Sequence, residues 1–285
     1  RPMGELCRVL RAIGVSVSGD AQKGFQIQGP FLVTEGTFDV DCSETTQFLS
    51  GLRLASWDTG LIFREKDLSA SLLYLQQTNH VIELVKNRSE LQVPVDFSSA
   101  SYPLCLGVIQ GPLYLRNCFF IDEDQADSCF VDIINTQVGG SCEFTEEGLK
   151  IAPPQGKLAP FEVDGRYSPD LMPTLAVLAC FCYGTSRLNN LDVLRRKECD
   201  RLEEIQRVLE KMGVDFLLLE GDHLEIQGRS FQDEHLFQMY EAPRDHRMIM
   251  MVGLFFSLLH GGEIHNAQYV DKSFPRFFDF LCSAN

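Results

Sequence analysis

The chain has 285 residues, which is enough for one large domain or two medium ones. Hydrophobic residues make up 45% of it and charged residues 23%, which is typical of globular proteins. A formal net charge of −15 argues against nucleic acid as a partner. The apolar run at residues 248–259 is too short to cross a membrane, so we expect no membrane partner either.

Ten cysteines are scattered along the chain without a C-x-x-C pair. Several lie in apolar stretches, which favours reduced, buried thiols in a cytoplasmic protein. No His and Cys residues have the spacing of a zinc site, so the sequence predicts no metal. No signal peptide is recognised. The chain starts with Arg1-Pro2 and runs directly into a helical pattern, so we expect a piece of a longer protein.

The spacing of apolar residues predicts two kinds of helix. The first kind is long, apolar and ends in glycine, and it is expected at residues 98–111, 168–184 and 245–262. The second kind is more polar, and it is expected at residues 125–139, 197–213 and 273–282. Upstream, the same kinds are expected at residues 3–14, 46–55 and 68–80. Short strands are predicted at residues 149–151, 216–219 and 224–226, with loops at 152–156 and 227–234.

The two kinds of helix alternate with a period of about 70 residues, which is the signature of an internal repeat. The sequence therefore predicts an α/β fold of βα repeats around a pseudo-threefold axis, with helices inside a covering of sheets. A break in composition near residues 93–95 predicts two domains. The first would span residues 1–94, and the second, with three βα repeats, residues 95–285.

Three short motifs place cations at or near expected helix starts. They are KECDR at residues 197–201, DHR at 245–247 and KSFP at 272–275. A helix start carries free N–H groups and the positive end of the helix dipole, and an added Arg or Lys completes a site for phosphate or carboxylate. Three such motifs, with carboxylates beside them, predict an enzyme that handles small anions.

Each residue in these motifs also has a simpler interpretation. Lys197 and Arg201, four residues apart, would share a helix face, where they could bind an anion or pair with nearby carboxylates in solvent. Glu198 could serve only to favour the helix dipole. Arg247 precedes an almost wholly apolar helix and favours an anion site, whereas His246 is more typical of a structural hydrogen bond than of catalysis.

Three further positions are candidates by their place at expected helix starts. Ser168 followed by Pro169 is typical of an N-cap, which would leave Asp170 in the first turn, where carboxylates are common for electrostatic reasons alone. Lys272 before an expected cap at Ser273 would oppose the helix dipole, which hints at another role. The run TTQ at residues 45–47 could cradle a phosphate or simply cap a helix.

These motifs, in this order, resemble the enolpyruvyl transferase family, and within it the 5-enolpyruvylshikimate-3-phosphate synthases. The segments that carry the resemblance are RPMG at 1–4, DFSSASY at 96–102, KECDR at 197–201, DHRM at 245–248 and KSFP at 272–275. The match runs over nearly the whole chain, and five motifs in order are highly specific. The sister family that acts on UDP-N-acetylglucosamine lacks the pairing of DHR with KSFP and ranks second.

The resemblance implies two lobes, each a threefold βα repeat (an inside-out α/β barrel), that close over the substrates. The implied activity transfers the enolpyruvyl group of phosphoenolpyruvate to the 5-hydroxyl of shikimate 3-phosphate and releases phosphate, a step of the shikimate pathway in aromatic amino acid biosynthesis. It needs no cofactor or metal. The expected partners are these two small anionic substrates, with no nucleic acid and no membrane, and the protein is expected to be a cytoplasmic monomer.

The resemblance also assigns roles to single residues. Asp170 would be the base at the hydroxyl, and Glu198 would act in proton transfer at the methylene. Phosphoenolpyruvate would be bound by five residues: Arg1, Gln47, Arg201, Arg247 and Lys272. Shikimate 3-phosphate would be bound by Thr45, Thr46, Gln47, Asp170 and Lys197.

The chain departs from the family pattern at a few positions. Thr45-Thr46 replaces a Ser pair, Val193 replaces an Asn, and residues 65–68 lack the hydroxyls of an S-x-x-Y element. An amino-terminal segment that carries a catalytic Lys in the family is also missing. A catalytically silent, ligand-binding remnant of the same fold is therefore the alternative to the enzyme.

Overall fold

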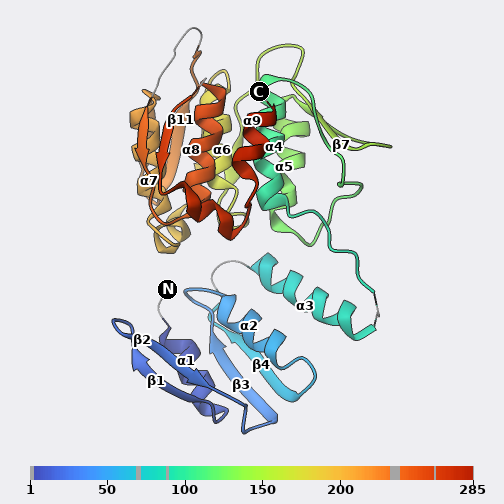
Figure 1. Ribbon diagram of the computed structural model, residues 1–285, viewed down its shortest axis with the longest axis vertical. Helices are drawn as coiled ribbons and strands as arrows, with labels where there is room; N and C mark the ends of the chain where they lie inside the picture. The colour runs from blue at the N-terminus through green and yellow to red at the C-terminus, as the bar shows by residue number, and fades with distance from the viewer. Residues whose placement is uncertain (1–2, 69–71, 88–89, 232–237, 260, 285) are drawn as a thin grey trace. The chain divides into compact units, whose positions relative to one another are not determined.

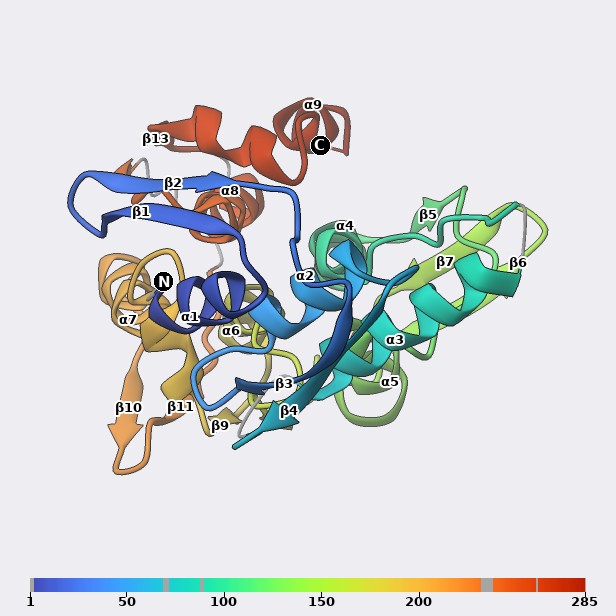
Figure 2. The same ribbon diagram turned by 90° about the horizontal axis from the view of Figure 1, so that it is seen from below.

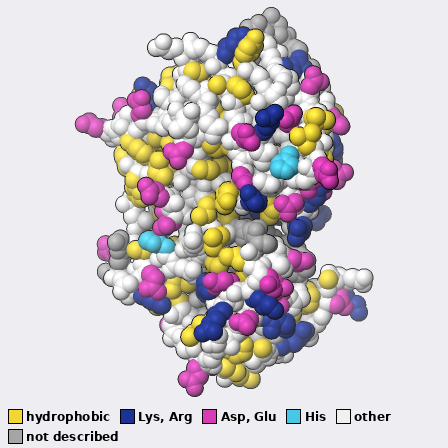
Figure 3. Space-filling model, turned by 180° about the vertical axis from the view of Figure 1, so that it is seen from behind, with side chains coloured by type: hydrophobic (Ala, Val, Ile, Leu, Met, Phe, Trp, Pro, Cys, Tyr) yellow, Lys and Arg dark blue, Asp and Glu magenta, His cyan; other side chains and the backbone are white. Residues whose placement is uncertain are grey.

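The computed structural model describes residues 3–68, 72–87, 90–231, 238–259 and 261–284. The chain divides into two compact units, unit 1 at Arg1–Val93 and unit 2 at Pro94–Asn285, and each is described by itself. Among the described residues, no helix is both long enough and apolar enough to span a membrane. Acidic and basic side chains are interspersed on the face shown in Figure 3, so opposite charges lie close together there.

Unit 1 combines an antiparallel hairpin with a parallel βαβ crossover (Figure 1). Its elements are α1 (Gly4–Ala12), β1 (Ser16–Asp20), β2 (Gly24–Gln28), β3 (Glu35–Asp41), α2 (Gln47–Ala55), β4 (Gly60–Lys66) and α3 (Leu72–Asn87). Strands β3 and β4 pair in parallel and α2 connects them. The helices predicted at residues 3–14 and 46–55 are confirmed, whereas the helix expected at 68–80 is α3, which ends later.

The described residues of unit 2 form three small sheets. The first has the order β5-β7-β6, from β5 (Leu113–Leu115), β6 (Ser141–Thr145) and β7 (Gly148–Ala152). The second has the order β10-β11-β9-β8, from β8 (Glu162–Asp164), β9 (Thr185–Asn189), β10 (Phe216–Leu219) and β11 (His223–Gln227). The third pairs β12 (Met239–Glu241) with β13 (Glu263–His265) in parallel. The strands predicted at residues 149–151, 216–219 and 224–226 are confirmed as β7, β10 and β11.

Three buried helices fill the centre of unit 2. They are α4 (Phe97–Gln110), α6 (Met172–Phe181) and α8 (His246–Leu258), and each contacts the other two. Figures 1 and 2 show them side by side, and in Figure 1 the sheet with β11 lies on one flank and the sheet with β7 on the other. Helix α6 is buried from Met172 to Cys180 because it is apolar all round. The predicted α/β fold, with helices inside a covering of sheets, is confirmed.

The more polar helices lie between these central ones in sequence. One is continuous from η1 (Ala126–Ser128) through α5 (Cys129–Ile133) to η2 (Ile134–Val138). The next is η3 (Asp192–Arg196) followed by α7 (Arg201–Lys211), and the last is η4 (Ala267–Lys272) followed by α9 (Phe277–Ala284). Helix α7 is amphipathic, with Leu202, Ile205 and Leu209 on its buried face, as the sequence predicts.

Three expected helix starts are wrong by several residues, and each error falls on a candidate residue. Helix α7 begins at Arg201 because Lys197 is extended and Asp200 caps the helix, accepting the N–H of Glu203 at 3.0 Å. Lys197 and Arg201 therefore do not share a helix face.

Helix α6 begins at Met172, and the Ser168 hydroxyl donates to the carbonyl of Ala126 at 2.9 Å instead of capping the helix. Asp170 consequently lies in the loop that precedes α6. Lys272 ends η4 and Ser273 follows it, while α9 starts only at Phe277. Because a cation is favourable at the end of a helix, the expected conflict with the dipole does not arise.

Candidate active site

Asp245 fixes the start of the central helix α8. Its backbone is extended and its carboxylate accepts the N–H of Arg247 at 2.9 Å, so it caps the helix. The side chain of Asp245 has no exposed surface. A charge in such a place needs a partner of opposite sign, because burial without one is very costly.

Arg201 is that partner, and it is bonded on every side by carboxylates. Its Nε donates to Oδ2 of Asp245 at 2.7 Å and its Nη1 to Oδ1 of Asp170 at 2.7 Å. Its Nη2 donates to Oε2 of Glu198 at 3.0 Å and reaches Oδ1 of Asp245 at 3.3 Å. Burial would lower the pKa of Arg201, but the carboxylates of Asp170 and Asp245 raise it. Each nitrogen of this guanidinium is therefore already bonded to the protein.

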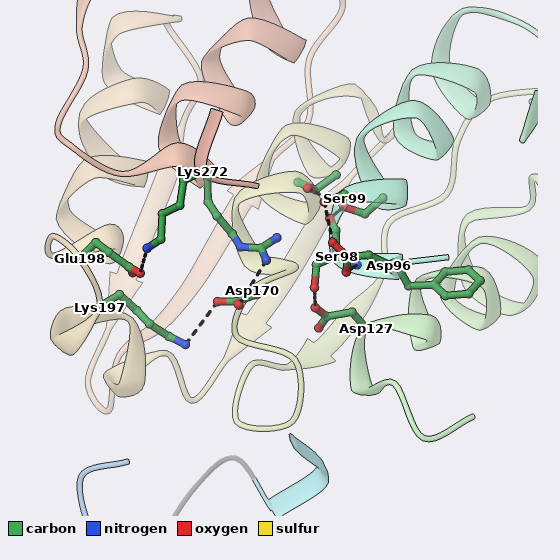
Figure 4. A network of polar contacts seen from close by, with 12 residues as sticks. Asp96, Ser98, Ser99, Asp127, Asp170, Lys197, Glu198 and Lys272 are labelled. Carbon is green, nitrogen blue, oxygen red and sulfur yellow. Dashed lines mark hydrogen bonds and ion pairs between the residues drawn. The ribbon is translucent and has the colours of Figure 1, made fainter. Parts of the chain in front are cut away.

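Asp170 lies among three cations. Besides Arg201, it contacts Nζ of Lys197 at 3.3 Å and Nη2 of Arg247 at 3.4 Å. Figure 4 shows Lys197 pointing toward this carboxylate. Burial alone would raise the pKa of Asp170, but the charges of Arg247, Lys197 and Arg201 outweigh it and hold the pKa well below its usual range. Asp170 is ionised at neutral pH.

Glu198 bridges Arg201 to the more exposed Lys272. Nζ of Lys272 donates to Oε1 of Glu198 at 2.9 Å (Figure 4). Burial would raise the pKa of Glu198, yet the hydrogen bond from Lys272 and the charge of Arg201 lower it to about 2. The Lys272 side chain is 60% exposed, so its ammonium is accessible to solvent.

Arg247 differs from Arg201 because most of its donors are unused. It is buried in the first turn of α8, where burial would lower its pKa and Asp170 raises it, so it stays charged. Its Nε and Nη1 have no hydrogen-bond partner among the described residues. Nδ1 of the neighbouring His246 also has no hydrogen-bond partner among the described residues. Burial and the charge of Arg247 lower the pKa of the His246 imidazole. A buried cation with two open donors is suited to receive an anion.

The structure thus brings together the six predicted residues of unit 2. They are Asp170, Lys197, Glu198, Arg201, Arg247 and Lys272. Thr45, Thr46 and Gln47 lie in unit 1 at the start of α2, where the N–H of Gln47 donates to Oγ1 of Thr45 at 3.2 Å and Thr46 is buried. Arg1 lies outside the described residues.

Several polar residues of the site were not given a role from sequence. Asp245, which holds Arg201, is one of them. Another is Asp127, whose carboxylate accepts a hydrogen bond from the Ser98 hydroxyl (Figure 4). The DFSSASY motif contains Ser98 and could have identified it as a site residue. The sequence around Asp127 has no feature that marks this aspartate. Among the residues that the structure describes, no group of three or more His, Cys, Asp or Glu side chains could hold a metal ion.

The sequence matches known proteins over most of its length. Residues 66–281 match the model of the family EPSP synthase (3-phosphoshikimate 1-carboxyvinyltransferase). The chain belongs to this family. The 3-phosphoshikimate 1-carboxyvinyltransferase of Archaeoglobus fulgidus is 31% identical over 99% of the chain and 70% of the relative. That of Methanopyrus kandleri is 30% identical over 99% of the chain and 69% of the relative.

Solved structures of EPSP synthase and of another enolpyruvyl transferase share the fold. EPSP synthase from Acinetobacter baumannii superposes with a TM-score of 0.70, at 19% identity, over all of the chain and 71% of that protein. The enolpyruvyl transferase NikO from Streptomyces tendae gives a TM-score of 0.69 at 13% identity, over all of the chain and 72% of that protein. These two likenesses support the fold of the EPSP synthase family found here.

Proposed function

We propose that this chain carries the enolpyruvyl-transfer chemistry of an EPSP synthase. The reaction moves the enolpyruvyl group of phosphoenolpyruvate to the 5-hydroxyl of shikimate 3-phosphate and releases phosphate. Family membership supports the activity. The observation that carries it at the site is Arg247, a buried arginine with two open donors beside the ionised Asp170. An anion and a hydroxyl could meet there.

Phosphoenolpyruvate would be bound first by the cations that can still donate. Arg247 offers Nε and Nη1, and Lys272 offers an exposed ammonium. Arg201 can reach the substrate only if one of its three carboxylates releases it. Glu198 is the most exposed of the three and also pairs with a second cation, the exposed Lys272. A substrate carboxylate that takes Lys272 and Arg201 would therefore displace Glu198.

This exchange gives Glu198 a way to carry a proton. With a pKa of about 2 it is an ionised carboxylate and no acid at neutral pH. Once an anion occupies Lys272 and Arg201, the two main causes that lower the pKa of Glu198 are weakened, and the pKa rises toward its ordinary value. Proton transfer to the methylene would then follow substrate binding.

Asp170 would accept the proton of the attacking hydroxyl. A carboxylate with a strongly lowered pKa is a weak base, so Asp170, like Glu198, needs its pKa raised by substrate binding before it can accept a proton. Substrate anions that bind Lys197 and Arg247 would weaken their hold on Asp170 and raise its pKa. One oxygen of Asp170 is held by Arg201, and this contact would keep the carboxylate oriented while its other oxygen faces the hydroxyl.

The acceptor would be held through its phosphate and its hydroxyls. Lys197 has a buried stem and an ammonium at Asp170, which is suited to a hydroxylated ring near the base. The phosphate of the acceptor is proposed to be held by Thr45, Thr46 and Gln47. Gln47 is also proposed to bind phosphoenolpyruvate, as is Arg1. A cytoplasmic monomer that needs no cofactor remains the prediction for the whole protein.

The two alternatives make different predictions. A silent remnant of the fold would bind anions at Arg247 without turnover, and a transferase for a UDP-sugar would not use shikimate 3-phosphate. Phosphate release from phosphoenolpyruvate plus shikimate 3-phosphate separates them, measured for this chain and for the longest product of its gene. We expect release, loss of it in Glu198→Gln, and near-normal release in Glu204→Gln, whose carboxylate pairs with Arg207 on the same helix.

Absence of phosphate release from both proteins contradicts the proposal. Full activity of Glu198→Gln would remove Glu198 from the mechanism.

A further inference from the structure

A chain of hydroxyl groups crosses the core of unit 2 where its three central helices meet. Oγ of Ser101, from α4, lies 3.0 Å from Oγ1 of Thr174, from α6, and donates to the carbonyl of Ser98 at 2.8 Å. Thr174 also interacts with the phenol of Tyr102. Ser101, Thr174 and Tyr102 have no exposed surface. Ser101 and Tyr102 belong to the DFSSASY segment, and Thr174 contacts it. The proposed reaction assigns no role to this segment.

The hydroxyl chain ends on the backbone of Arg247. The phenol of Tyr102 donates to the carbonyl oxygen of Arg247 at 3.3 Å. Burial raises the pKa of Tyr102 to about 12, so the phenol keeps its proton and remains a donor. A carbonyl in the first turn of a helix already accepts the N–H four residues on. The bond from Tyr102 is therefore additional, and it ties the first turn of α8 to α4.

The ring of Tyr102 holds the neighbouring element as well. It packs edge-on against Phe277 of α9, with ring centroids 5.6 Å apart and planes at 76°. Phe277 packs in turn against Phe274, two residues after Lys272, at 5.6 Å. Tyr102 thus contacts the first turn of α8 directly and the segment after Lys272 through Phe277 and Phe274. A Phe at position 102 would keep this packing and lose the polar contacts of the phenol, with Arg247 and with Thr174.

Arg247 depends on such support because little else fixes its guanidinium. Among the described residues its side chain pairs with Asp170 at 3.4 Å, while Nε and Nη1 have no hydrogen-bond partner. The direction of the side chain is then set by the backbone from which it starts. A displacement of a binding group by about 1 Å can reduce a rate by orders of magnitude.

We propose that Tyr102 is a positioning residue for the anion site, which aims Arg247 by fixing the first turn of α8, with Thr174 and Ser101 orienting its phenol. The proposal rests on the proposed function, in which Arg247 binds phosphoenolpyruvate. It differs from a purely structural role, in which the hydroxyls would only satisfy one another within the core.

The test compares Tyr102→Phe with Tyr240→Phe. Tyr240 is also buried, and its phenol donates to Glu204 at 2.8 Å, but it does not contact Arg247 in any described interaction. Each variant loses the hydrogen bonds of one buried phenol, so both should lose a similar, small amount of thermal stability. Only Tyr102→Phe should raise the KM for phosphoenolpyruvate, by about 3- to 10-fold, with kcat within about twofold of the wild type.

A double-mutant cycle tests the route of the effect. Because Tyr102 acts through Arg247, Tyr102→Phe should cause no further loss of phosphoenolpyruvate affinity in an Arg247→Met background. Calorimetric binding of phosphoenolpyruvate, without the acceptor, gives the same comparison if the protein does not turn over. Loss of turnover with the expected binding pattern would contradict the proposed function and leave the positioning role supported.

Three results overturn the proposal. They are an unchanged KM and affinity in Tyr102→Phe, an equal change in Tyr240→Phe, and additive effects in the double mutant. A wild-type protein that neither turns over nor binds phosphoenolpyruvate overturns the positioning role and the proposed function together.

Discussion

Replacing Arg201 with Met should strongly lower the free energy of unfolding of the protein. Met keeps much of the aliphatic volume but removes the charge that faces three carboxylates. Glu198 would keep Lys272, and Asp170 would keep Lys197 and Arg247. Asp245 would lose its only cationic contact among the described residues and keep the N–H of Arg247 and the thiol of Cys199. The cost therefore falls mainly on one fully buried carboxylate.

That cost can be estimated from the burial of the pair. The side chains of Arg201 and Asp245 are 2% and 0% exposed. Removing one partner of a buried ion pair costs about 3–5 kcal/mol, a large share of the ~5–15 kcal/mol that stabilises a typical domain. Arg207→Met is the matched control on the same helix. Arg207 pairs with Glu204, and the Arg207 side chain is about half exposed, so the free energy of unfolding should fall by only about 0–1 kcal/mol.

Denaturant unfolding followed by far-ultraviolet circular dichroism measures the difference. Trp57 is the single tryptophan and lies in unit 1, so its fluorescence monitors the other unit as an internal reference. The second variant Arg201→Met/Asp245→Asn should recover part of the loss because it leaves no unpaired charge at Asp245. A loss below about 1 kcal/mol in Arg201→Met, or no recovery in the double variant, would refute the reasoning.

The pH dependence of this loss has a defined sign. The pKa of Asp170 is lowered in the folded protein, so its contribution to stability is complete above the unfolded pKa and is lost as pH falls. Arg201→Met removes one of its three cations and brings the pKa back up. The deficit of the variant should therefore shrink as the pH is lowered below about 4. A deficit that grows toward acid pH would contradict this account.

Three further outcomes can be checked separately. Lys272→Met should raise the pKa of Glu198 from about 2 toward its ordinary value, which carboxyl NMR can measure. The free energy of unfolding should fall by less than about 1 kcal/mol because Lys272 is largely exposed. In the wild type, the stability that Glu198 contributes is present above pH ~4.5 and is lost as the pH falls through about 2. Burial raises the pKa of Cys199 to about 12, so mass spectrometry after alkylation at pH ~8 should find exposed Cys282 modified and Cys199 intact until the protein unfolds. Gly107→Ala should lower the free energy of unfolding by about 1–3 kcal/mol, because the new methyl would lie 2.3 Å from a side-chain carbon in β7, and an unchanged denaturation midpoint would show that α4 can shift.

The fold could be predicted from sequence where the local signal is strong. Helices α4 and α8 are mostly apolar and buried, and they begin after Asp96 and Asp245, which accept N–H groups of their first turns. The repeat of such helices is visible in the chain itself, and it predicted the layered arrangement. The amphipathic α7 was equally clear, since Leu202 and Ile205 recur on one face.

The predictions that failed treated every motif as helical from its first residue. Lys197 and Arg201 are four residues apart, but they meet at Asp170, which is 27 residues from Lys197 along the chain. Contacts of this range depend on how α6 and α7 pack, and no periodicity encodes them. The set of site residues came from family resemblance, whereas the bonding of Arg201 to three carboxylates could be known only from the structure.

The open donors of Arg247 have a consequence for how this protein can change. Two buried N–H groups with no partner among the described residues make the fold less stable than it could be, since an unsatisfied buried donor costs about 1–3 kcal/mol. An apolar side chain such as Met at this position would remove that cost together with the anion site, and it would also take one of its three cations from Asp170. The presence of Arg247 marks a position where ligand capture has been kept at a cost in stability.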